Sequence, residues 1–381
     1  MIVDNITIVI CAVLIVLAVL SSLLDLFFKK IPTSGDEDGQ GSDACQPVSV
    51  IIICDNNAEE LRTNLPVFLE QDYPAGYELI VVIDKDEDGS GDVLKTFSSY
   101  PNLYTTFVPE TSRYMSRRKL AITLGVKAAK NEWVLLTDAT CRPASDKWIS
   151  RMASGCSENM DIVLGYSNYS CDDANFKVFY RFHREYALLR EALGGTAYGM
   201  AGNNLMFRKS MFMKGNGFQG NLKYLRGEYE FIANKYSRED NVAIEIHPES
   251  HLSDAPSSTK AWRNMNVFYV ETRRRLDCGF KHKFMFDVDM ISMHLCLLCS
   301  LGAAAWSAVY SQWLILSFAC LSLLILIVAR ILNAKRSMRA FGLNVSWWKI
   351  FPFELRIVWH NLRFAIVYDF ADKYDFISHK S

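Results

Sequence analysis

The chain has 381 residues, with 41 basic and 42 acidic side chains and a formal net charge of -1. This balance argues against a nucleic-acid-binding protein, which would carry a strongly basic surface. A chain that is half apolar and 13% aromatic is not intrinsically disordered. Ten cysteines are too few for a disulfide scaffold of this size, so we expect most of them to be reduced and buried.

The first apolar stretch runs from Ile6 to Leu24 and is long enough to cross a hydrocarbon layer of about 30 Å as a helix. A cleaved signal peptide is the alternative, but the segment lacks a positive start and a small-residue cleavage site. We therefore predict a retained anchor over residues 1–30. Lys29 and Lys30 follow it directly and place the next residues in the cytoplasm.

Two further apolar stretches, at 288–310 and 313–331, predict a transmembrane hairpin over residues 284–332. Basic clusters lie on both sides of this pair, so both flanks are expected in the cytoplasm. Asp289 and His294 leave a buried core helix as the alternative for the first stretch. The topology predicts a multi-pass protein of a cell inner membrane with its middle domain in the cytoplasm.

Residues 341–370 have a different pattern, because tryptophan, phenylalanine and tyrosine alternate with charged side chains. This composition is typical of an amphipathic segment at the membrane surface rather than of a fourth span.

The middle of the chain predicts an α/β domain. A linker rich in Gly, Ser and Asp is expected over residues 31–46. After it, buried strands at 48–53, 79–83, 103–108 and 133–136 alternate with helices at 58–70, 93–100 and 118–130. Such alternation is typical of a mostly parallel sheet, in which ligands bind beyond the carboxyl ends of the strands.

Acidic side chains follow two of these strands. Asp84, Asp86 and Asp88 come after the second strand, and Asp138 ends the fourth. Carboxylates gathered at one sheet edge would suit a hard divalent cation, Mg²⁺ or Mn²⁺. A solvated acidic turn is the alternative for the first group.

A series of motifs in the order and spacing of one family extends from residue 48 to about 275. The run Val48–Ile53 is followed by Asn57, the acidic loop by Arg118-Lys119-Leu120-Ala121, and Thr137-Asp138-Ala139-Thr140 stands in the place of a D-x-D motif. Gly202-Asn203-Asn204 and Gly227-Glu228-Tyr229-Glu230 come later. Residues 47–275 thus resemble the membrane-bound, inverting family 2 glycosyltransferases, whose domain is the Rossmann-like GT-A fold.

The resemblance implies transfer of a sugar from a nucleotide-sugar to a lipid-linked or saccharide acceptor at the cytoplasmic face of the membrane. It implies nucleotide contacts from Asn57, Asp84, Asp86, Arg118 and Lys119, and a divalent cation at Asp138. It places Gly202, Asn203, Asn204 and Trp262 on the acceptor side, and Glu228 or Glu230 as the base that deprotonates the acceptor hydroxyl.

Three departures from the family pattern fall on the chemistry. Thr140 replaces the last Asp of D-x-D, so a cation would be held weakly. Tyr229 stands at the expected base position, although Tyr, with a pKa near 10, is a weak base at neutral pH. The Q-x-x-R-W motif is not legible near residues 262–270. These departures support a second hypothesis, a catalytically impaired homologue that binds a nucleotide or a partner protein.

Overall fold

The structure is a computed structural model that describes residues 4–32, 46–109, 116–170, 175–277 and 280–377. Most of the predicted linker at 31–46 therefore lies outside the described residues. The chain forms two compact units: unit 1 contains residues 1–31, 173–179 and 278–362, and unit 2 contains residues 32–172, 180–277 and 363–381.

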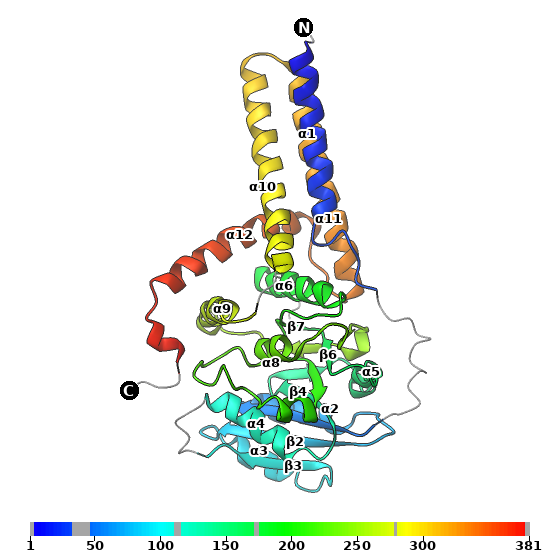
Figure 1. Cartoon of the computed structure of the whole chain (residues 1–381), viewed down its shortest axis with the longest axis vertical. Coiled ribbons are helices and arrows are strands. Elements are labelled where there is room, and N and C mark those ends of the chain that lie inside the picture. The colour runs from blue at the N-terminus through cyan, green and yellow to red at the C-terminus, as the bar shows by residue number, and fades with distance from the viewer. Residues whose placement is uncertain (1–3, 33–45, 110–115, 171–174, 278–279, 378–381) are drawn as a thin grey trace. The chain divides into compact units, whose positions relative to one another are not determined.

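Unit 2 is built on a seven-stranded sheet with the order β3-β2-β1-β4-β8-β6-β9 (Figure 1). Strands β1, β2, β3 and β4 are parallel, and only β8 runs antiparallel to its neighbours. The predicted mostly parallel α/β domain is confirmed. The strands are β1 (Val48–Asp55), β2 (Tyr77–Lys85), β3 (Leu103–Phe107), β4 (Trp133–Asp138), β6 (Ile162–Gly165), β8 (Leu205–Arg208) and β9 (Val242–Glu245).

Helices pack on both faces of this sheet. The helices of unit 2 are α2 (Ala58–Leu69), α3 (Ser90–Thr96), α4 (Arg117–Ala128), α5 (Trp148–Ser154), α7 (Lys209–Lys214), α8 (Glu228–Tyr236) and α9 (Thr259–Arg273), with α6 (Phe176–Ala192) shared between the units. Of these, α2 joins the core on one face of β1, and α4 lies against the other. The predicted helix at 93–100 begins three residues earlier, after Gly89 in the left-handed conformation.

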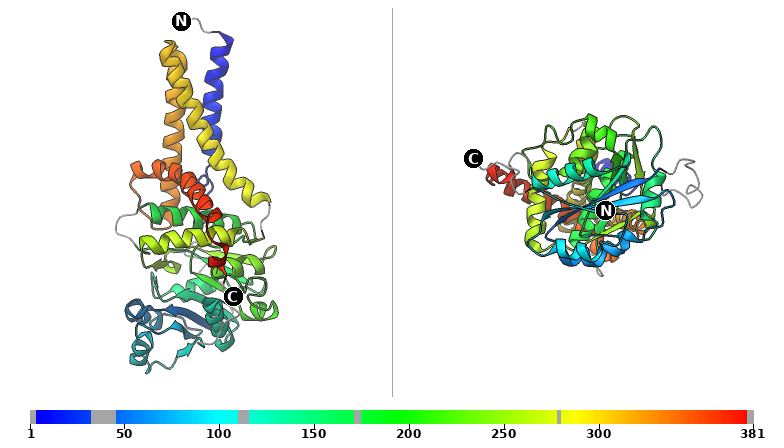
Figure 2. Two further views of the ribbon diagram at one scale, coloured as in Figure 1. Left: turned by 90° about the vertical axis from the view of Figure 1, so that its left-hand side faces the viewer. Right: turned by 90° about the horizontal axis from the view of Figure 1, so that it is seen from below.

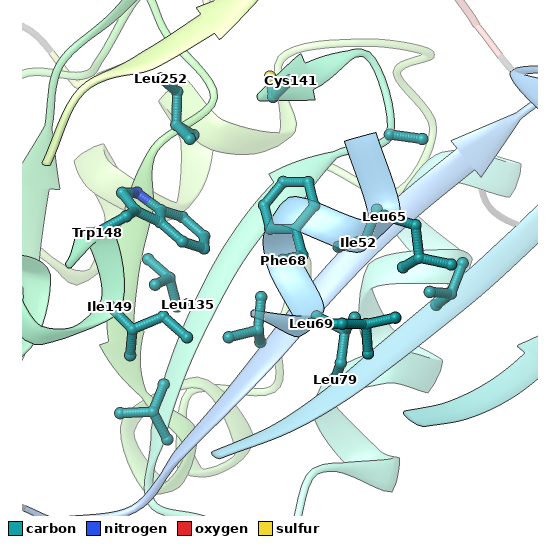
Figure 3. Packing of buried hydrophobic residues seen from close by; sticks show 14 of the residues in the cluster. Ile52, Leu65, Phe68, Leu69, Leu79, Leu135, Cys141, Trp148, Ile149 and Leu252 are labelled. Carbon is teal, nitrogen blue, oxygen red and sulfur yellow. The ribbon is translucent and has the colours of Figure 1, made fainter. Parts of the chain in front are cut away.

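The β1 run is buried on both faces because its alternate side chains pack in opposite directions. One set joins a core with Phe68, Trp148 and Leu252 (Figure 3). On the other face Gly125 of α4 lies so close to Ile51 that a Cβ there would be 2.6 Å from Cγ2. The continuous β-branched pattern therefore predicted this strand correctly.

A second, three-stranded sheet has the order β5-β10-β7, with β5 (Cys141–Pro143), β7 (Ser167–Tyr169) and β10 (Leu252–Asp254). In its register Asp254 pairs with Cys141 and with Tyr169. The short helices η2 (Pro248–Ser250) and η3 (Lys373–Phe376) complete the regular elements of unit 2.

Unit 1 contains three helices that are long and apolar enough to span a membrane: α1 (Asn5–Leu24), α10 (Phe280–Val309, apolar from Asp287) and α11 (Trp313–Ala340). They lie side by side (Figure 2). Large apolar side chains such as Ile6, Val13 and Leu298 are exposed on their outer surfaces, as expected for helices surrounded by lipid. The last helix, α12 (Trp347–Asp369), begins in unit 1.

A buried ion cluster joins all four helices of unit 1. The Arg330 guanidinium on α11 is 2.7 Å from Glu354 of α12, 2.7 Å from Asp289 of α10 and 3.6 Å from Asp25, which follows α1. These side chains are almost completely buried. Asp289 is therefore a partner of Arg330 and not an exposed group at the membrane entry, as its position near the start of the predicted span suggested.

We expect Arg330→Met to lower the free energy of unfolding of the detergent-purified protein by about 3–5 kcal/mol, because it leaves buried carboxylates without their cation. Burial raises the pKa of Glu354 despite the attraction of Arg330, so Glu354→Gln resembles the protonated side chain and should cost much less. Arg336→Met, on the exposed side of the same helix, is the control. Equal melting temperatures for Arg330→Met and Arg336→Met would contradict the structural role of the cluster.

Candidate active site

The carboxyl ends of three neighbouring parallel strands bring the two predicted aspartates to one edge of the sheet. Asp84 lies near the end of β2 and Asp138 ends β4, and both strands pair with β1. Two strand spacings separate them, or about 10 Å. Both side chains are buried, at 8% and 6% exposure. This is the edge at which doubly wound sheets bind their ligands.

Three consecutive basic residues begin α4, beside this edge. Arg117 holds Asp84, donating from Nε to Oδ1 at 2.7 Å and from Nη2 to the Asp84 carbonyl oxygen. The predicted nucleotide contacts include Arg118 and Lys119 but not Arg117, although Arg117 is the residue that contacts the first aspartate. Its place in the same basic run was the available signal.

Arg118 is the centre of the second ion-pair group. Its Nη2 lies 2.5 Å from both carboxylate oxygens of Asp138, and its Nε lies 3.6 Å from Glu228 of α8. Burial would lower the pKa of Arg118, but Asp138 and Glu228 outweigh burial and hold it well above its ordinary value. Burial also raises the pKa of Asp138, against the attraction of Arg118.

The Tyr229 hydroxyl donates to Oδ1 of Asp138 over 3.0 Å. Burial, reinforced by Asp138, raises the pKa of Tyr229 well above its usual value. Tyr229 therefore keeps its proton at neutral pH and acts here as a hydrogen-bond donor. A phenol in this state cannot serve as the base that its position in the motif suggested.

Glu228, the first residue of α8, is 4% exposed, and its Oε1 has no hydrogen-bond partner among the described residues. Its other oxygen faces Arg118. A buried carboxylate oxygen without a donor is costly, and a catalytic role or a bound water or ion is among the explanations for such a group. Glu230 is two residues further along α8; burial raises its pKa, and Arg184 interacts with it electrostatically.

Lys119 is completely buried and points away from the sheet edge. Its ammonium donates to the carbonyl oxygens of Asn221 (2.9 Å), Tyr224 and Arg226 (3.5 Å). Burial lowers its pKa to about 8. Lys119 therefore holds the loop of residues 221–226, which precedes α8 in the chain. Its ammonium does not extend outward toward a diphosphate.

The side chains of the acidic loop after β2 are largely engaged with backbone amides of the loop and of the neighbouring helices. Asp86 accepts a hydrogen bond from the Gly91 amide, and Asp88 accepts from the amides of Ala58 and Ser90. The Asn57 side chain accepts from the Asp55 amide. The bonds of Asp88 and Asp86 satisfy amides in the first turns of α2 and α3. Nucleotide contact by Asn57 and Asp86 therefore stays a prediction. Asp84, in contrast, is held by Arg117.

A second buried network lies behind Asp138. The Thr140 hydroxyl donates to Oδ1 of Asp254 over 2.7 Å, and Arg181 donates to Oδ2 over 2.7 Å and to Ser167 over 3.0 Å. Neither Asp254 nor Arg181 is among the predicted site residues, because the contact between Asp254 and Thr140 joins residues 114 positions apart. Thr140 thus has a hydroxyl where the usual motif has a carboxylate. This hydroxyl binds the carboxylate of Asp254 on β10.

These contacts decide how well the site suits a divalent cation. The oxygens of Asp138 face Arg118 and Tyr229, and Thr140 is bonded to Asp254. Within the part of the chain that the structure describes, no group of three or more His, Cys, Asp or Glu side chains could hold a metal ion. In the described residues the Asp138 oxygens are thus paired with Arg118 and Tyr229, and a weakly held divalent cation at Asp138 stays a prediction.

The predicted acceptor-side residues have three different environments. Asn204 is completely buried, accepts from the Trp148 indole and donates to the carbonyl oxygens of Tyr166 and Ser250. It supports the fold. Gly202 leaves no room for a side chain, since a Cβ would lie 2.2 Å from the Ser167 hydroxyl.

Asn203 and Trp262 remain candidates for acceptor contact. Asn203 is half-buried beside Asp254, with its Nδ2 3.4 Å from the Oδ2 carboxylate oxygen. Trp262, on α9, packs edge-on against Tyr180 and Phe364. The Asn203 amide nitrogen donates to Ser167, which also binds Arg181, so Asn203 belongs to the network behind Asp138.

Residues 49–215 match the family model described as glycosyl transferase family 2. This range contains β1 to β8 and the ion pairs of Arg117 and Arg118. The chain therefore carries a family 2 glycosyltransferase domain, and its mostly parallel α/β sheet is of the GT-A type.

Solved structures show distant similarity. The mannosyltransferase PcManGT from Pyrobaculum calidifontis, in complex with GDP-Man and Mn²⁺, is 16% identical over 94% of this chain and 98% of that chain, with a TM-score of 0.49. TarS 1-349 from S. aureus, in complex with UDP, is 15% identical over 62% and 68%, with a TM-score of 0.42. No curated protein matches the chain by sequence. The match to the family model carries the assignment.

We expect Lys119→Met to destabilise the domain, because three carbonyl oxygens lose their donor, and the buried one, that of Asn221, is left unsatisfied at a cost of about 1–3 kcal/mol. The melting temperature should fall, and protease cleavage within residues 221–226 should accelerate. Lys127→Met, on the exposed side of the same helix, is the matched control. Unchanged cleavage in Lys119→Met would show that Lys119 does not hold this loop.

Proposed function

We propose that this chain transfers a sugar from a nucleotide-sugar donor to an acceptor hydroxyl, with inversion at the anomeric carbon. The observation that carries the proposal is the position of Glu228. This buried carboxylate follows the matched range 49–215 by thirteen residues and lies next to the Arg118–Asp138 pair, and among the described residues one of its oxygens has no hydrogen-bond donor. A base and a cation thus stand together at the sheet edge.

The reaction needs a base and a group that stabilises the departing diphosphate. Glu228 would take the proton of the acceptor hydroxyl while its oxygen attacks the anomeric carbon from the side opposite the leaving group. Negative charge then develops on the nucleoside diphosphate. Arg118, fixed by Asp138 and about one-fifth exposed, is placed to stabilise that charge without reorganising.

Glu228 is favoured as the base over the alternatives in the same motif. Tyr229 stays protonated and is bonded to Asp138. Glu230 interacts with Arg184, on α6. Asp138 has both oxygens engaged by Arg118, so Asp138 positions the guanidinium and does not need to act on the substrate itself.

The three apolar helices suggest an acceptor that is also held by the membrane. An enzyme anchored in the bilayer meets a lipid-linked acceptor at a high effective concentration. Lys29 and Lys30 at the end of α1, and Lys335, Arg336 and Arg339 at the end of α11, favour a cytoplasmic position for these ends. We propose a multi-pass inner-membrane enzyme whose domain faces the cytoplasm.

A catalytically impaired homologue remains the second candidate. The observation that favours it is the pairing of Asp138 with Arg118 and Tyr229, together with Thr140, which leaves no preformed cation site in the described residues. Such a protein would bind a nucleotide or a partner protein without turnover. Binding and turnover experiments separate the two candidates.

We expect one nucleotide among UDP, GDP and CMP, or its sugar, to raise the melting temperature of the detergent-purified protein. At a hundred times its dissociation constant a ligand adds about 2.7 kcal/mol to the free energy of unfolding. Each ligand is measured with Mn²⁺, with Mg²⁺ and with a chelator, which also tests the weakly held cation predicted at Asp138. No shift with any ligand would contradict the donor site.

We expect Glu228→Gln to reduce turnover by about 10²–10⁴, the usual contribution of general-base catalysis, with little change in donor binding. Glu230→Gln should reduce turnover much less. The readout is sugar transfer to a lipid extract or hydrolysis of the donor, next to the thermal shift with the bound nucleotide. Full turnover in Glu228→Gln would assign the base elsewhere, and no turnover in the unmodified protein despite nucleotide binding would favour the impaired homologue.

A further inference from the structure

The last described residues of the chain lie against the loop that precedes α8. The Leu225 amide donates a hydrogen bond to the Phe376 carbonyl oxygen over 3.0 Å, and Tyr224 and Ile377 form an antiparallel bridge. These residues all belong to unit 2. The end of a chain frays unless contacts tie it down, so the attachment indicates a role for residues 364–377, which we call the C-terminal strap.

Aromatic packing fixes the strap on α9. Phe376 is 4% exposed, and its ring lies edge-on to that of Phe268, with the centroids 5.3 Å apart. The Tyr368 ring lies 5.2 Å from the Phe376 ring. Phe364, at the start of the strap, packs edge-on against Trp262 of α9. Helix α9 therefore contacts the strap near both of its ends.

Polar contacts add to this packing. The Tyr368 hydroxyl donates to the buried carboxylate of Glu271, and Asp369 lies 3.0 Å from Arg274. The Lys373 ammonium donates to the Tyr368 carbonyl oxygen. The strap is therefore bound to unit 2 along most of its length.

The 221–226 loop is also bound to the start of α4. The Ser116 hydroxyl donates to the Leu225 carbonyl oxygen over 2.9 Å, and Lys119 donates to the carbonyl oxygen of Asn221 over 2.9 Å. Ser116 and Lys119 stand on either side of Arg118 in the chain. Leu225 thus bonds to the strap through its amide and to α4 through its carbonyl oxygen, so one residue joins the strap to the helix that carries Arg118.

The same loop leads directly into α8. Gly227 has a φ of +89° and stands against α9, where a Cβ would lie 2.5 Å from Cγ2 of Thr272. Glu228 is the next residue. The position of Glu228 therefore depends on the loop before it and on α9, and the strap contacts both.

We propose that the C-terminal strap holds the 221–226 loop so that Glu228 and Arg118 keep their mutual geometry, with Phe376 as a positioning residue. Phe376 acts on the site through Leu225 and through α9. The effect on catalysis rests on the proposed function, whereas the effect on the loop does not. A displacement of about 1 Å at a reacting group can cost roughly 10² in rate, so the strap is able to control turnover.

Trypsin tests the loop directly, because Lys223 and Arg226 are exposed. In the full, detergent-purified chain, Phe376→Ala should accelerate cleavage at these two residues at least about tenfold, since cleavage follows the population of the open loop. Cleavage at the exposed Lys130, which follows α4, should keep its rate. The matched control is Tyr374→Ala, whose side chain is 64% exposed in η3. Equal loop cleavage in the two variants would overturn the proposal.

A disulfide supplies a second test. Bridge partners in antiparallel strands have Cα atoms about 4.5–5.5 Å apart, within the range of a disulfide. The double variant Tyr224→Cys, Ile377→Cys should therefore cross-link on mild oxidation. With Phe376→Ala added, the cross-link should return loop cleavage to the rate of the unmodified chain until the disulfide is reduced. The absence of a cross-link, or fast cleavage in the cross-linked chain, would contradict the strap.

Turnover separates positioning from stability. With a nucleotide-sugar that the unmodified protein uses, Phe376→Ala should lower kcat about 10–100-fold and leave the donor KM within about twofold, because the loss lies in the geometry of the reacting groups. The disulfide should restore kcat. A loss of kcat in proportion to the loss of nucleotide-binding sites would reflect unfolded protein and contradict a positioning role. No turnover by the unmodified protein would overturn the proposed function, and loop cleavage would still decide whether the strap holds the loop.

Discussion

The candidate site depends on the first turn of α4, where three consecutive basic residues point in three directions. A helix rotates by about 100° per residue, so Arg117 reaches the end of β2, Arg118 reaches β4 and α8, and Lys119 reaches the 221–226 loop. Positive charges at the start of a helix are unfavourable for its dipole. Asp84, Asp138 and Glu228 offset that cost, and the same contacts tie the carboxyl edge of the sheet to α8.

The network behind Asp138 gives this arrangement a rigid support. Asp254 receives hydrogen bonds from Thr140 and Arg181, and Arg181 also binds Ser167. Strand β10, which carries Asp254, pairs with both β5 and β7. The second sheet thereby connects Thr140, two residues after Asp138, to Ser167 and Asn203 through one set of buried polar contacts.

The strands and the order of the site motifs could be predicted from the sequence, because both are local. The buried run at 48–53 and the acidic end of β4 are visible as patterns, and the parallel sheet follows from the alternation of strands and helices. The direction in which each side chain of α4 points cannot be predicted from such local patterns. It depends on where the helix begins, and the structure starts it at Arg117, one residue before the predicted start.

Long-range polar contacts are the other part that the sequence could not supply. The side-chain amide of Asn204 bonds to Trp148, Tyr166 and Ser250. Nothing in the neighbouring sequence indicates these contacts. Asn204 was therefore predicted to face an acceptor, although it is buried. Arg330 is a comparable case in unit 1. Its charge lies inside an apolar run, and its three carboxylate partners come from segments far apart in the chain.

The Arg330 cluster has a consequence for biosynthesis. Asp25 directly follows the first helix and accepts a hydrogen bond from Asn333, which is synthesised 308 residues later. At about 5–20 residues per second, this interval is roughly 15–60 s. During that time Asp25 lacks the guanidinium of Arg330 that lies 3.6 Å from it in the folded chain. The cluster can therefore form only after α11 and α12 have been synthesised, which makes it a late step in the assembly of unit 1.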